Sequence, residues 1–231
     1  MLSMQQSGRE IGTTAEVKRR VRAAVARTAP WLLWPTPEGA SSLQIERKYA
    51  LLRTLDETRE VPGAILEVGS YLSGTAAMAN AFLRRTGTPR RYVCVDTFDG
   101  FLPEHFERDL EHGTPAEDEA LFDAHDKAMV TKLLNRWGEP DIELVQGDIC
   151  TMPDAALPSP VAVCLVDVDL EIPIYDGLRR VVPLVSRGGV VLVDDCPELT
   201  SWAGARVGYR RYCADSGVRE EYMNGFGVIR A

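Results

Sequence analysis

The amino-acid sequence predicts a doubly wound α/β fold, and three observations support this prediction. Five strand-length apolar runs follow one another through the middle of the chain, helical patterns separate them, and glycine or an acidic residue follows each run. Runs that are apolar almost throughout are typical of strands buried on both faces. Because strands and helices alternate, we expect a mostly parallel sheet with helices on both of its faces.

The individual elements follow from these patterns. The five strands are expected at Ala64–Val68, Tyr92–Val95, Ile142–Val145, Val161–Val166 and Val190–Val193. Helices between strands are expected at Thr75–Arg85, at Lys127–Trp137 and behind Pro173, where apolar residues recur at helical spacing from Ile174 to Val185.

Further elements are expected at both ends of the chain. A helix near Gly204–Ala214 precedes two short strands, Val218–Met223 and Phe226–Ile229, which are joined by a hairpin turn at Asn224-Gly225 and complete a seven-stranded sheet. Two helical patterns, Ala15–Thr28 and Ser41–Leu55, come before the first strand. We expect residues 1–60 to form an N-terminal helical cap on a main domain that spans residues 61–231.

Composition limits the class of protein. The chain has 231 residues, of which 45% are hydrophobic and 26% are charged, as in an ordinary globular domain. No run reaches the ~18 apolar residues of a membrane helix, and the first thirty residues hold no apolar signal core, so we expect a cytoplasmic protein without a membrane partner. Five widely spaced cysteines without a C-x-x-C pair argue against a zinc site or a disulfide framework.

The net charge of −8 is unevenly distributed. Residues 96–126 carry eleven acidic residues against a single base, Arg108, and this balance disfavours a nucleic-acid partner. Most of these charges are expected to be solvated. The connection 97–126 is long, however, and long connections are often functional, so we expect an acidic lid that folds over the site and becomes ordered when a ligand binds.

A glycine loop follows the first strand, at the sheet edge where ligands bind in such folds. Its sequence is Glu67-Val-Gly69-Ser-Tyr-Leu-Ser73-Gly74. It lacks both the lysine of a phosphate-binding P-loop and the first spacing of the dinucleotide fingerprint. Asp96, 22 residues after Gly74, is placed to bind a ribose diol, and Glu67 suits a cationic ligand such as S-adenosylmethionine. Tight packing between strand and helix is the alternative explanation of the glycines.

We expect the cofactor to contact the residues at the ends of the first four strands, with Asp148 near the adenine amino group. These residues are Glu67, Gly69, Ser70, Tyr71, Ser73, Asp96, Thr97, Phe98, Gly147, Asp148, Ile149 and Asp167.

Four carboxylates follow the fourth and fifth strands, namely Asp167, Asp169, Asp194 and Asp195. Carboxylates at neighbouring strand ends repel one another unless a cation lies among them. Oxygen ligands without histidine or cysteine select Mg²⁺, Mn²⁺ or Ca²⁺. Each aspartate alone could instead cap a helix or face water, and Asp169 is the weakest member of the set.

The motifs resemble, in order and spacing, the macrocin and mycinamicin O-methyltransferases (the TylF-type family). The matching pieces include Asp96-Thr-Phe-Asp-Gly-Phe101, Asp167-Val-Asp169-Leu170 and Gly188-Gly189-Val-Val-Leu-Val-Asp194-Asp195. The resemblance runs from about Val61 to the C-terminus. Where the family usually has a tyrosine and then a Ser/Thr-containing helix start, this chain has Glu171-Ile-Pro-Ile-Tyr175.

This resemblance implies a Rossmann-like class I methyltransferase fold and a Mg²⁺-dependent transfer of a methyl group from S-adenosylmethionine to a hydroxyl of a natural product, such as a sugar or a phenol. The family's metal ligands correspond to Asp167, Asp194 and Asp195, and its proposed base corresponds to Asp167. We expect a small-molecule acceptor and a homodimer or higher homo-oligomer.

Alternatives remain open from the sequence. They are a metal-independent enzyme with this fold and another chemistry, a non-catalytic protein that binds S-adenosylmethionine, and a NAD-dependent oxidoreductase. His105, His112 or His125 could act as the base instead of Asp167, although histidines in an acidic segment are more often solvated. Cys196 could be a nucleophile, but no base partner is evident in the sequence.

Overall fold

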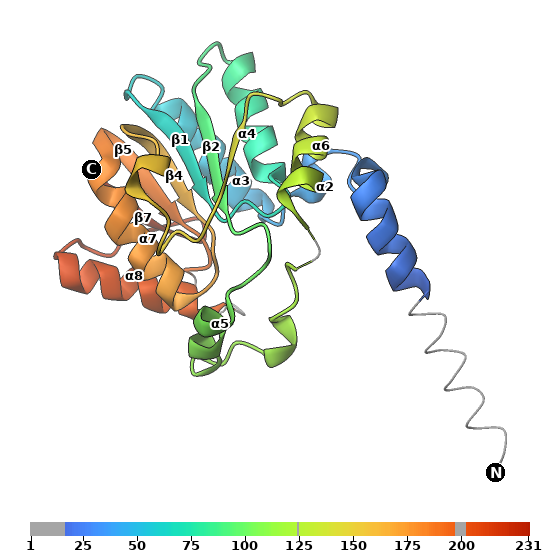
Figure 1. The fold of residues 1–231 in the computed structure, drawn as a ribbon. Coiled ribbons are helices and arrows are strands. Elements are labelled where there is room, and N and C mark those ends of the chain that lie inside the picture. The colour runs from blue at the N-terminus through green and yellow to red at the C-terminus, as the bar shows by residue number, and fades with distance from the viewer. Residues whose placement is uncertain (1–16, 124, 197–201) are drawn as a thin grey trace.

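The computed structural model describes residues 17–123, 125–196 and 202–231, and within them it forms one mixed sheet flanked by helices (Figure 1). The strands are β1 (Ala64–Val68), β2 (Tyr92–Asp96), β3 (Glu143–Gln146), β4 (Val161–Val166), β5 (Val185–Val193), β6 (Tyr222–Met223) and β7 (Phe226–Arg230). Their order across the sheet is β3-β2-β1-β4-β5-β7-β6. Strands β1 to β5 pair in parallel, and β7 pairs antiparallel with both β5 and β6. The predicted seven-stranded, mostly parallel sheet is confirmed.

The longer helices cover both faces of the sheet. They are α3 (Ile45–Glu57), α4 (Gly74–Arg85), α5 (Pro103–Leu110), α6 (Lys127–Trp137), α7 (Glu171–Val181) and α8 (Ala203–Ser216). The short helical segments are α2 (Pro37–Ala40), η1 (Pro30–Leu32), η2 (Ala116–Asp118), η3 (Asp154–Ala156) and η4 (Val182–Leu184), and residues 17–28 are helical.

Alternate residues of each central strand pack on opposite faces, which explains why the runs are apolar throughout. In β4, Val163 and Leu165 face the core formed with α3, α4 and α6, whereas Cys164 and Val166 face the core formed with α7 and α8. Both cores consist of fully buried aliphatic and aromatic side chains. The helix α3, from the predicted N-terminal cap, contributes Leu51 and Leu55 to the first core. Because α3 shares its core with the sheet, the division into an N-terminal cap (residues 1–60) and a main domain (residues 61–231) stays a prediction.

Several boundaries differ from the sequence prediction. The helix expected up to Val185 ends at Val181, because Pro183 cannot continue the hydrogen-bond pattern of an α-helix. The strand β5 begins at Val185, before the predicted Val190. Its first half contains the run from Ser186 to Gly189, in which Arg187 and Gly188 are exposed, and this run shows no apolar pattern. The helices α5 and α2 were not predicted. The elements β3 and α3 are shifted by a few residues, β6 is shortened to two residues, and other ends shift by one or two residues.

The strand order places a topological switch between β1 and β4. From β1 the chain moves outward to β2 and β3, and then returns to β4 and continues to β5. The carboxyl ends of β1, β2, β4 and β5 therefore meet at one edge, where such folds bind ligands. In Figure 1, α5 lies beyond this edge, apart from α4 and α6.

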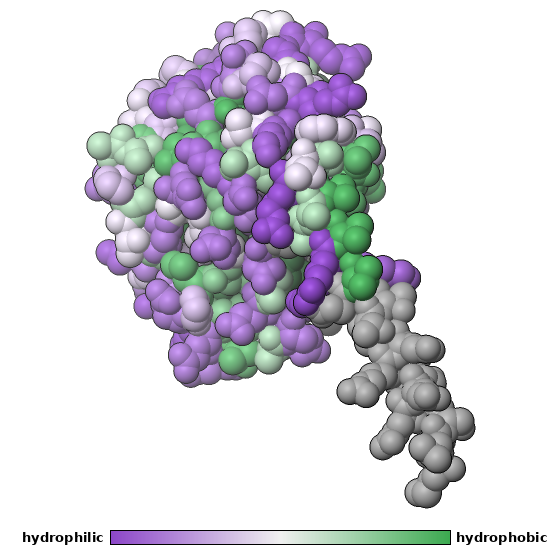
Figure 2. Space-filling model, turned by 45° about the vertical axis from the view of Figure 1, so that its right-hand side comes forward, coloured by the Kyte–Doolittle hydropathy of each residue, from purple (hydrophilic) through white to green (hydrophobic). Residues whose placement is uncertain are grey.

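The N-terminal helix extends away from the body of the protein (Figure 1). Every residue from 17 to 24 is exposed, including Val17 at 58% and Val21 at 57%. Figure 2 shows apolar side chains gathered on the side of the molecule that adjoins the grey N-terminal segment. Among the described residues, no helix has the length and apolar character needed to cross a membrane. The cytoplasmic location stays a prediction.

Candidate active site

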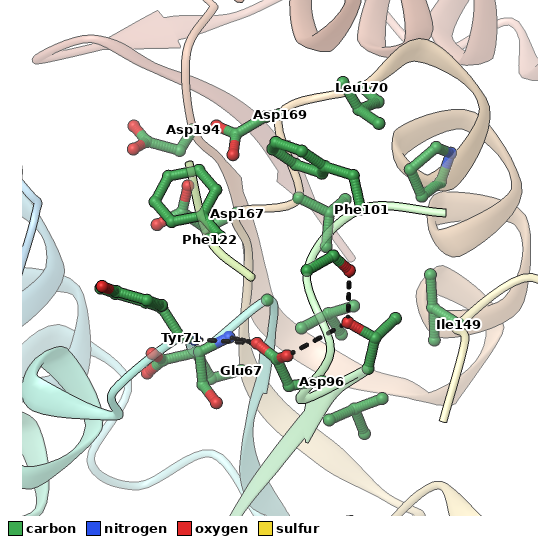
Figure 3. A pocket seen from close by; sticks show the side chains of 18 of the residues that line it. Glu67, Tyr71, Asp96, Phe101, Phe122, Ile149, Asp167, Asp169, Leu170 and Asp194 are labelled. Atoms are coloured by element: carbon green, nitrogen blue, oxygen red, sulfur yellow. Dashed lines mark hydrogen bonds between the residues drawn. The ribbon is translucent and has the colours of Figure 1, made fainter. Parts of the chain in front are cut away.

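A cavity of about 430 Å³ opens at the carboxyl ends of β1 to β5. It is lined by all of the predicted cofactor and metal residues except Ser73 and Phe98. Ser73 is fully buried, and its hydroxyl donates to Ser70 Oγ at 3.1 Å, while the Phe98 ring is 2% exposed and packs in the core. These two residues are therefore buried and do not line the cavity. Figure 3 shows Glu67, Tyr71 and Asp96 on one side of the cavity and Asp167, Asp169 and Asp194 on the other.

Parallel-sheet hydrogen bonds continue one residue beyond the strands and hold the site residues in line. The backbone N–H of Gly69 donates to Val95 O at 2.8 Å, and that of Gly147 donates to Asp96 O at 2.9 Å. Asp167 donates to Val68 O at 2.8 Å, and Asp194 donates to Val166 O at 2.9 Å. The sheet itself therefore fixes these four residues. This explains why they could be located from the predicted strand ends alone.

The glycine loop turns sharply against the end of β4. Gly69 has a φ of +81°, and a Cβ atom at this position would lie 1.9 Å from the backbone oxygen of Asp167. Only glycine can adopt this conformation at such a close approach without a shift of the backbone. The loop therefore needs glycine here to bring the end of β1 against the end of β4 at Asp167.

Asp96 organises the loop through its carboxylate. Oδ2 accepts the backbone N–H of Ser70 at 2.7 Å and that of Tyr71 at 2.8 Å, and Oδ1 accepts that of Phe98 at 2.7 Å. Burial alone would raise the pKa of Asp96, but His125 and the backbone N–H groups outweigh it, so the pKa is lowered. The Thr97 hydroxyl is a fourth and weaker contact, 3.5 Å from Oδ1, and a ligand hydroxyl could replace it among the roughly four acceptor positions of the carboxylate.

Glu67 lies inside the site as a buried acid. Its side chain accepts a hydrogen bond from the Tyr92 hydroxyl at 2.7 Å, and the residue is 1% exposed. Burial raises the pKa of Glu67 to about 8, against the Tyr92 hydrogen bond that lowers it. The carboxyl is therefore largely protonated at neutral pH, and a nearby cationic group would favour its ionised form.

Asp148 holds the loop that follows β3. Its Oδ1 accepts the backbone N–H of Cys150 at 2.9 Å, and its Oδ2 accepts the Thr151 hydroxyl at 2.9 Å. His105, from α5, brings a ring nitrogen within 4.8 Å of ligand atoms of Asp148 and Cys150. The connection between β2 and α6 thus reaches the proposed adenine side of the cavity.

Three aspartates meet on the other side of the cavity. Asp167, Asp194 and Asp195 each offer a carboxylate oxygen, and these oxygens lie within 4.8 Å of one another. Asp169 lines the same cavity but does not belong to this group. Three hard oxygen donors at this spacing fit one divalent cation of the Mg²⁺ type.

The acidic cluster raises the pKa values of its members. Burial raises the pKa of Asp167 and Asp169 well above the ordinary range, and the neighbouring carboxylates raise it further. Burial and the charge of Asp195 raise the pKa of Asp194 to about 6, although Arg47 opposes them. If every member were ionised, the group would hold more negative charge than its surroundings neutralise, so the raised pKa values favour the protonated form of these acids.

Arg47 was missed by the sequence analysis. It lies on α3, and its guanidinium Nη1 donates to Asp194 Oδ1 at 2.6 Å and to Asp195 Oδ1 at 2.9 Å. The residue is 7% exposed. A signal was present in the sequence, because Arg47 is four and eight residues before Leu51 and Leu55 and therefore falls on the buried stripe of its helix.

Aromatic rings cover the region near the aspartates. Phe101, Phe122 and Trp202 line the cavity, with ring centroids 5.3 Å apart for Phe101–Phe122 and 5.4 Å apart for Phe101–Trp202. Tyr71 contacts Phe122 edge-on at 5.1 Å. Figure 3 shows Phe101 and Phe122 in the same cavity as Asp167 and Asp194. These rings can exclude water and bind an apolar or ring-shaped group.

The acidic connection is anchored at Glu171, where the chain departs from the family pattern. Glu171 Oε2 accepts Arg108 Nε at 2.9 Å and lies 2.7 Å from His112 Nε2, and its backbone N–H donates to Asp109 Oδ1 at 2.8 Å. These contacts join α5 to the start of α7. Ordering of this segment on ligand binding stays a prediction.

The alternative catalytic groups have other contacts. His125 is buried against Tyr71, and its Nε2 lies 3.6 Å from Asp96 Oδ1 without a hydrogen-bond partner among the described residues. His112 contacts Glu171. Burial raises the pKa of Cys196 to about 12, so its thiol is neutral near pH 7 and is a weak nucleophile. Among the groups weighed as bases, Asp167 is the one that lies in the carboxylate cluster.

Comparison with known proteins identifies the family. The sequence model of the macrocin-O-methyltransferase (TylF) family matches residues 15–224. The chain belongs to this family. It is therefore an S-adenosylmethionine-dependent O-methyltransferase, as the resemblance of its motifs implied. A search of curated proteins finds no match.

Solved structures share the fold of this TylF-family enzyme. The O-methyltransferase NovP has 19% identity and a TM-score of 0.67, over 83% of this chain and 81% of NovP. The calicheamicin methyltransferase CalS11 has 18% identity and a TM-score of 0.61, over 94% of this chain and 91% of CalS11. An O-methyltransferase from Bacillus cereus in complex with SAH has 14% identity and a TM-score of 0.52, over 94% and 88% of the two chains. The predicted class I methyltransferase fold is confirmed.

Proposed function

We propose that this enzyme methylates a hydroxyl of a small-molecule natural product, a sugar or a phenol, with S-adenosylmethionine as donor and with a divalent cation of the Mg²⁺ type. One observation supports the proposal above all: a single cavity joins the glycine loop and Asp96 to the carboxylates of Asp167, Asp194 and Asp195. Donor, cation and acceptor can therefore meet in one place. When bound, the donor supplies an activated methyl group and the cation lowers the pKa of a hydroxyl.

The chain's own residues position the donor on the β1–β3 side. Asp96 accepts a ribose hydroxyl in addition to the loop amides, and Asp148 faces the adenine amino group. Glu67, which is buried and largely protonated without ligand, ionises next to the cationic amino-acid end of the donor. His125 adds a buried ring nitrogen beside Asp96 that has no hydrogen-bond partner among the described residues.

The β4–β5 side performs the proton transfer. Asp194 and Asp195 hold the cation together with Asp167, and a carboxylate oxygen of Asp167 accepts the proton from the acceptor hydroxyl. Phe101, Phe122 and Trp202 hold the acceptor against this cluster and exclude water from it. Alignment of the two reacting groups supplies the rest of the rate enhancement.

One of the similar structures supports a sugar acceptor. One structure of CalS11, with a TM-score of 0.54 and 18% identity over 94% of this chain and 93% of the other, is described as TDP-rhamnose 3'-O-methyltransferase in calicheamicin biosynthesis. The other structure of this protein is described as calicheamicin methyltransferase. The aromatic wall of the cavity suits the apolar face of a sugar ring as well as a phenol.

The test uses purified enzyme, S-adenosylmethionine and a panel of glycosylated and phenolic natural products, with product detected by mass spectrometry. We expect methylation of at least one acceptor class, its loss in EDTA, and its recovery when Mg²⁺ is added in excess. Asp194→Asn should lose most of the activity. Full activity in chelator, together with full activity of Asp194→Asn, would support metal-independent transfer. Tight donor binding without any product across the panel would favour a non-catalytic binding protein.

The enzyme also forms a homodimer or higher homo-oligomer in this proposal. Residues 17–28 carry five basic residues and no acidic residue, whereas residues 96–126 are strongly acidic. A short exposed helix gains most of its stability from packing. We therefore propose that a second copy of the chain covers the exposed Val17 and Val21, and that its acidic residues 96–126 attract the basic residues of this helix. Light scattering should give a mass of at least twice the 25.5 kDa of one chain, and Val21→Asp should lower this mass. A monomer at micromolar concentration would contradict this part.

A further inference from the structure

The contact between Arg47 and the aspartates crosses from the N-terminal part of the chain to the end of β5. The guanidinium donates at 2.6 Å to Asp194 and at 2.9 Å to Asp195, and the two side chains of the Arg47–Asp194 pair are 9% and 6% exposed. The turn between β6 and β7 lies on another side of the guanidinium, since a Cβ atom on Gly225 would lie 2.8 Å from Arg47 Nε. Arg47 is therefore held by contacts on two sides and is not a passing surface contact.

Both carboxylates that bind Arg47 belong to the group of three that can hold a cation. Asp194 and Asp195 share this group with Asp167, and the closest contacts of Arg47 are to the Oδ1 atoms of the first two. A guanidinium and a divalent cation that contact the same carboxylates repel each other, and the repulsion is strong where water is excluded. The two cations are therefore competitors for Asp194 and Asp195.

A positive partner against the aspartates reduces the repulsion between their carboxylates. The buried guanidinium donates to the Oδ1 atoms of both Asp194 and Asp195, so it is the positive partner that the described residues place against these carboxylates. Removal of the guanidinium would take away the positive partner of Asp194 and Asp195, and breaking a buried ion pair in this way destabilises a folded protein. Arg47 thus supplies, in the metal-free protein, the positive charge that a bound metal ion would supply to Asp194 and Asp195.

We infer that Arg47 is an internal counter-ion that occupies the carboxylates of Asp194 and Asp195 in the metal-free enzyme and gives way when the divalent cation binds. This inference rests on the proposed function, because it assumes that the three aspartates hold a metal. Arg47 lines the cavity beside Ser42 and Gln44, so the side chain has an open side into which it can turn. The arginine keeps the site formed without metal and limits the affinity of the metal.

The test measures Mn²⁺ affinity, by electron paramagnetic resonance of the free ion and by calorimetry, for three proteins. They are the wild type, Arg47→Met, which keeps the length of the side chain but not its charge, and Arg47→Lys, which keeps the charge. We expect Arg47→Met to bind Mn²⁺ about tenfold more tightly or better, and Arg47→Lys to stay within about threefold of the wild type. Equal or weaker binding by Arg47→Met would overturn the inference, since it would mean that Arg47 does not compete with the metal.

Thermal unfolding supplies a second readout that does not depend on activity. The metal-free Arg47→Met protein should unfold at a lower temperature than the wild type, and saturating Mn²⁺ should raise its Tm more than it raises that of the wild type. An Arg47→Met protein that folds only with Mn²⁺ present would support the same conclusion. An equal gain of Tm in the two proteins would count against it.

Asp194→Asn separates this inference from the proposed function. If Mn²⁺ binds the wild type and Arg47→Met with equal affinity, and Asp194→Asn abolishes binding, the metal site stands and only the role of Arg47 falls. If no variant binds Mn²⁺, or if Asp194→Asn has no effect, then the metal in the proposed function falls together with the inference.

Discussion

The two halves of the cavity treat their carboxylates in opposite ways. At the ends of β1 to β3, Asp96 and Asp148 accept hydrogen bonds from the backbone and side chains of their own loops, and the pKa of Asp96 is lowered. At the ends of β4 and β5, Asp167, Asp169 and Asp194 face other carboxylates, and their pKa values are raised.

This difference separates what each half needs in order to work. In the half at the ends of β1 to β3, which we propose binds the cofactor, backbone N–H groups already satisfy the carboxylate of Asp96 in the folded protein alone. In the half that carries the aspartate cluster, Arg47 is the positive partner that the described part of the chain places on Asp194 and Asp195. The proposed divalent cation would complete this half. A substitution in the aspartate cluster should therefore reduce catalysis more than stability. A substitution at Asp96 should reduce the stability of the protein without ligand.

The largest expected effect is on catalysis in the second half. Asp167→Asn removes the proposed proton acceptor while it mimics the protonated acid, so kcat should fall by about 100-fold or more. The Tm of the metal-free protein should not fall, because the amide removes a carboxylate that its neighbours already repel. Initial rates at saturating donor and acceptor, with differential scanning fluorimetry, measure both.

Asp169→Asn is the matched control, since Asp169 lines the same cavity but lies outside the group of three. It should retain most of its kcat. If both variants lose activity equally, the choice of Asp167 as the base is wrong.

The next effect is on stability in the first half. Asp96→Asn replaces a carboxylate that accepts three backbone N–H groups, and an amide can accept fewer of them. The free energy of unfolding should fall by about 2 kcal/mol, and the affinity for S-adenosylmethionine should fall with it. Urea denaturation without ligand and calorimetric titration of the donor are the measurements. A variant as stable as the wild type would show that the loop amides do not depend on Asp96.

Much of this site could be predicted because it lies in the part of the fold that sequence pattern describes well. The apolar runs locate the strands, and hydrogen bonds that continue past the strand ends fix Gly69, Gly147, Asp167 and Asp194. The order of the strands in the sheet then brings the ends together. Local sequence and one general rule of α/β folds were sufficient for these residues.

The site residues that were not predicted come from segments whose position against the sheet cannot be inferred from the local pattern of apolar and polar residues. Arg47 reaches Asp194 from a helix 147 residues earlier in the chain, and nothing local predicts which strand end that helix approaches. Phe122 and Trp202 lie outside regular strands and helices, and Phe122 belongs to the long connection after β2. The path of such a connection is set by tertiary contacts, here including those of Glu171 with Arg108 and His112.

The smallest effect is a change in the pH dependence of stability at Glu67, which belongs to the first half but is not satisfied by backbone amides. Its pKa is about 8 in the folded protein, above the ordinary value of 4.5. The folded state therefore binds this proton more tightly than the unfolded state does. The stabilisation is complete below about pH 4.5 and is lost as the pH rises to about 8.

Between pH 6 and pH 7 the folded protein keeps the proton of Glu67 and the unfolded chain has released it, so this group lowers the free energy of unfolding by about 1 kcal/mol over that step. Glu67→Gln should remove this part of the slope, and the difference between variant and wild type cancels the contributions of the aspartates, whose raised pKa values act in the same direction. Urea midpoints of both proteins at pH 6 and pH 7 give the comparison. Parallel slopes would show that Glu67 is ionised without a ligand, and the first half of the cavity would then need a cation as the second half does.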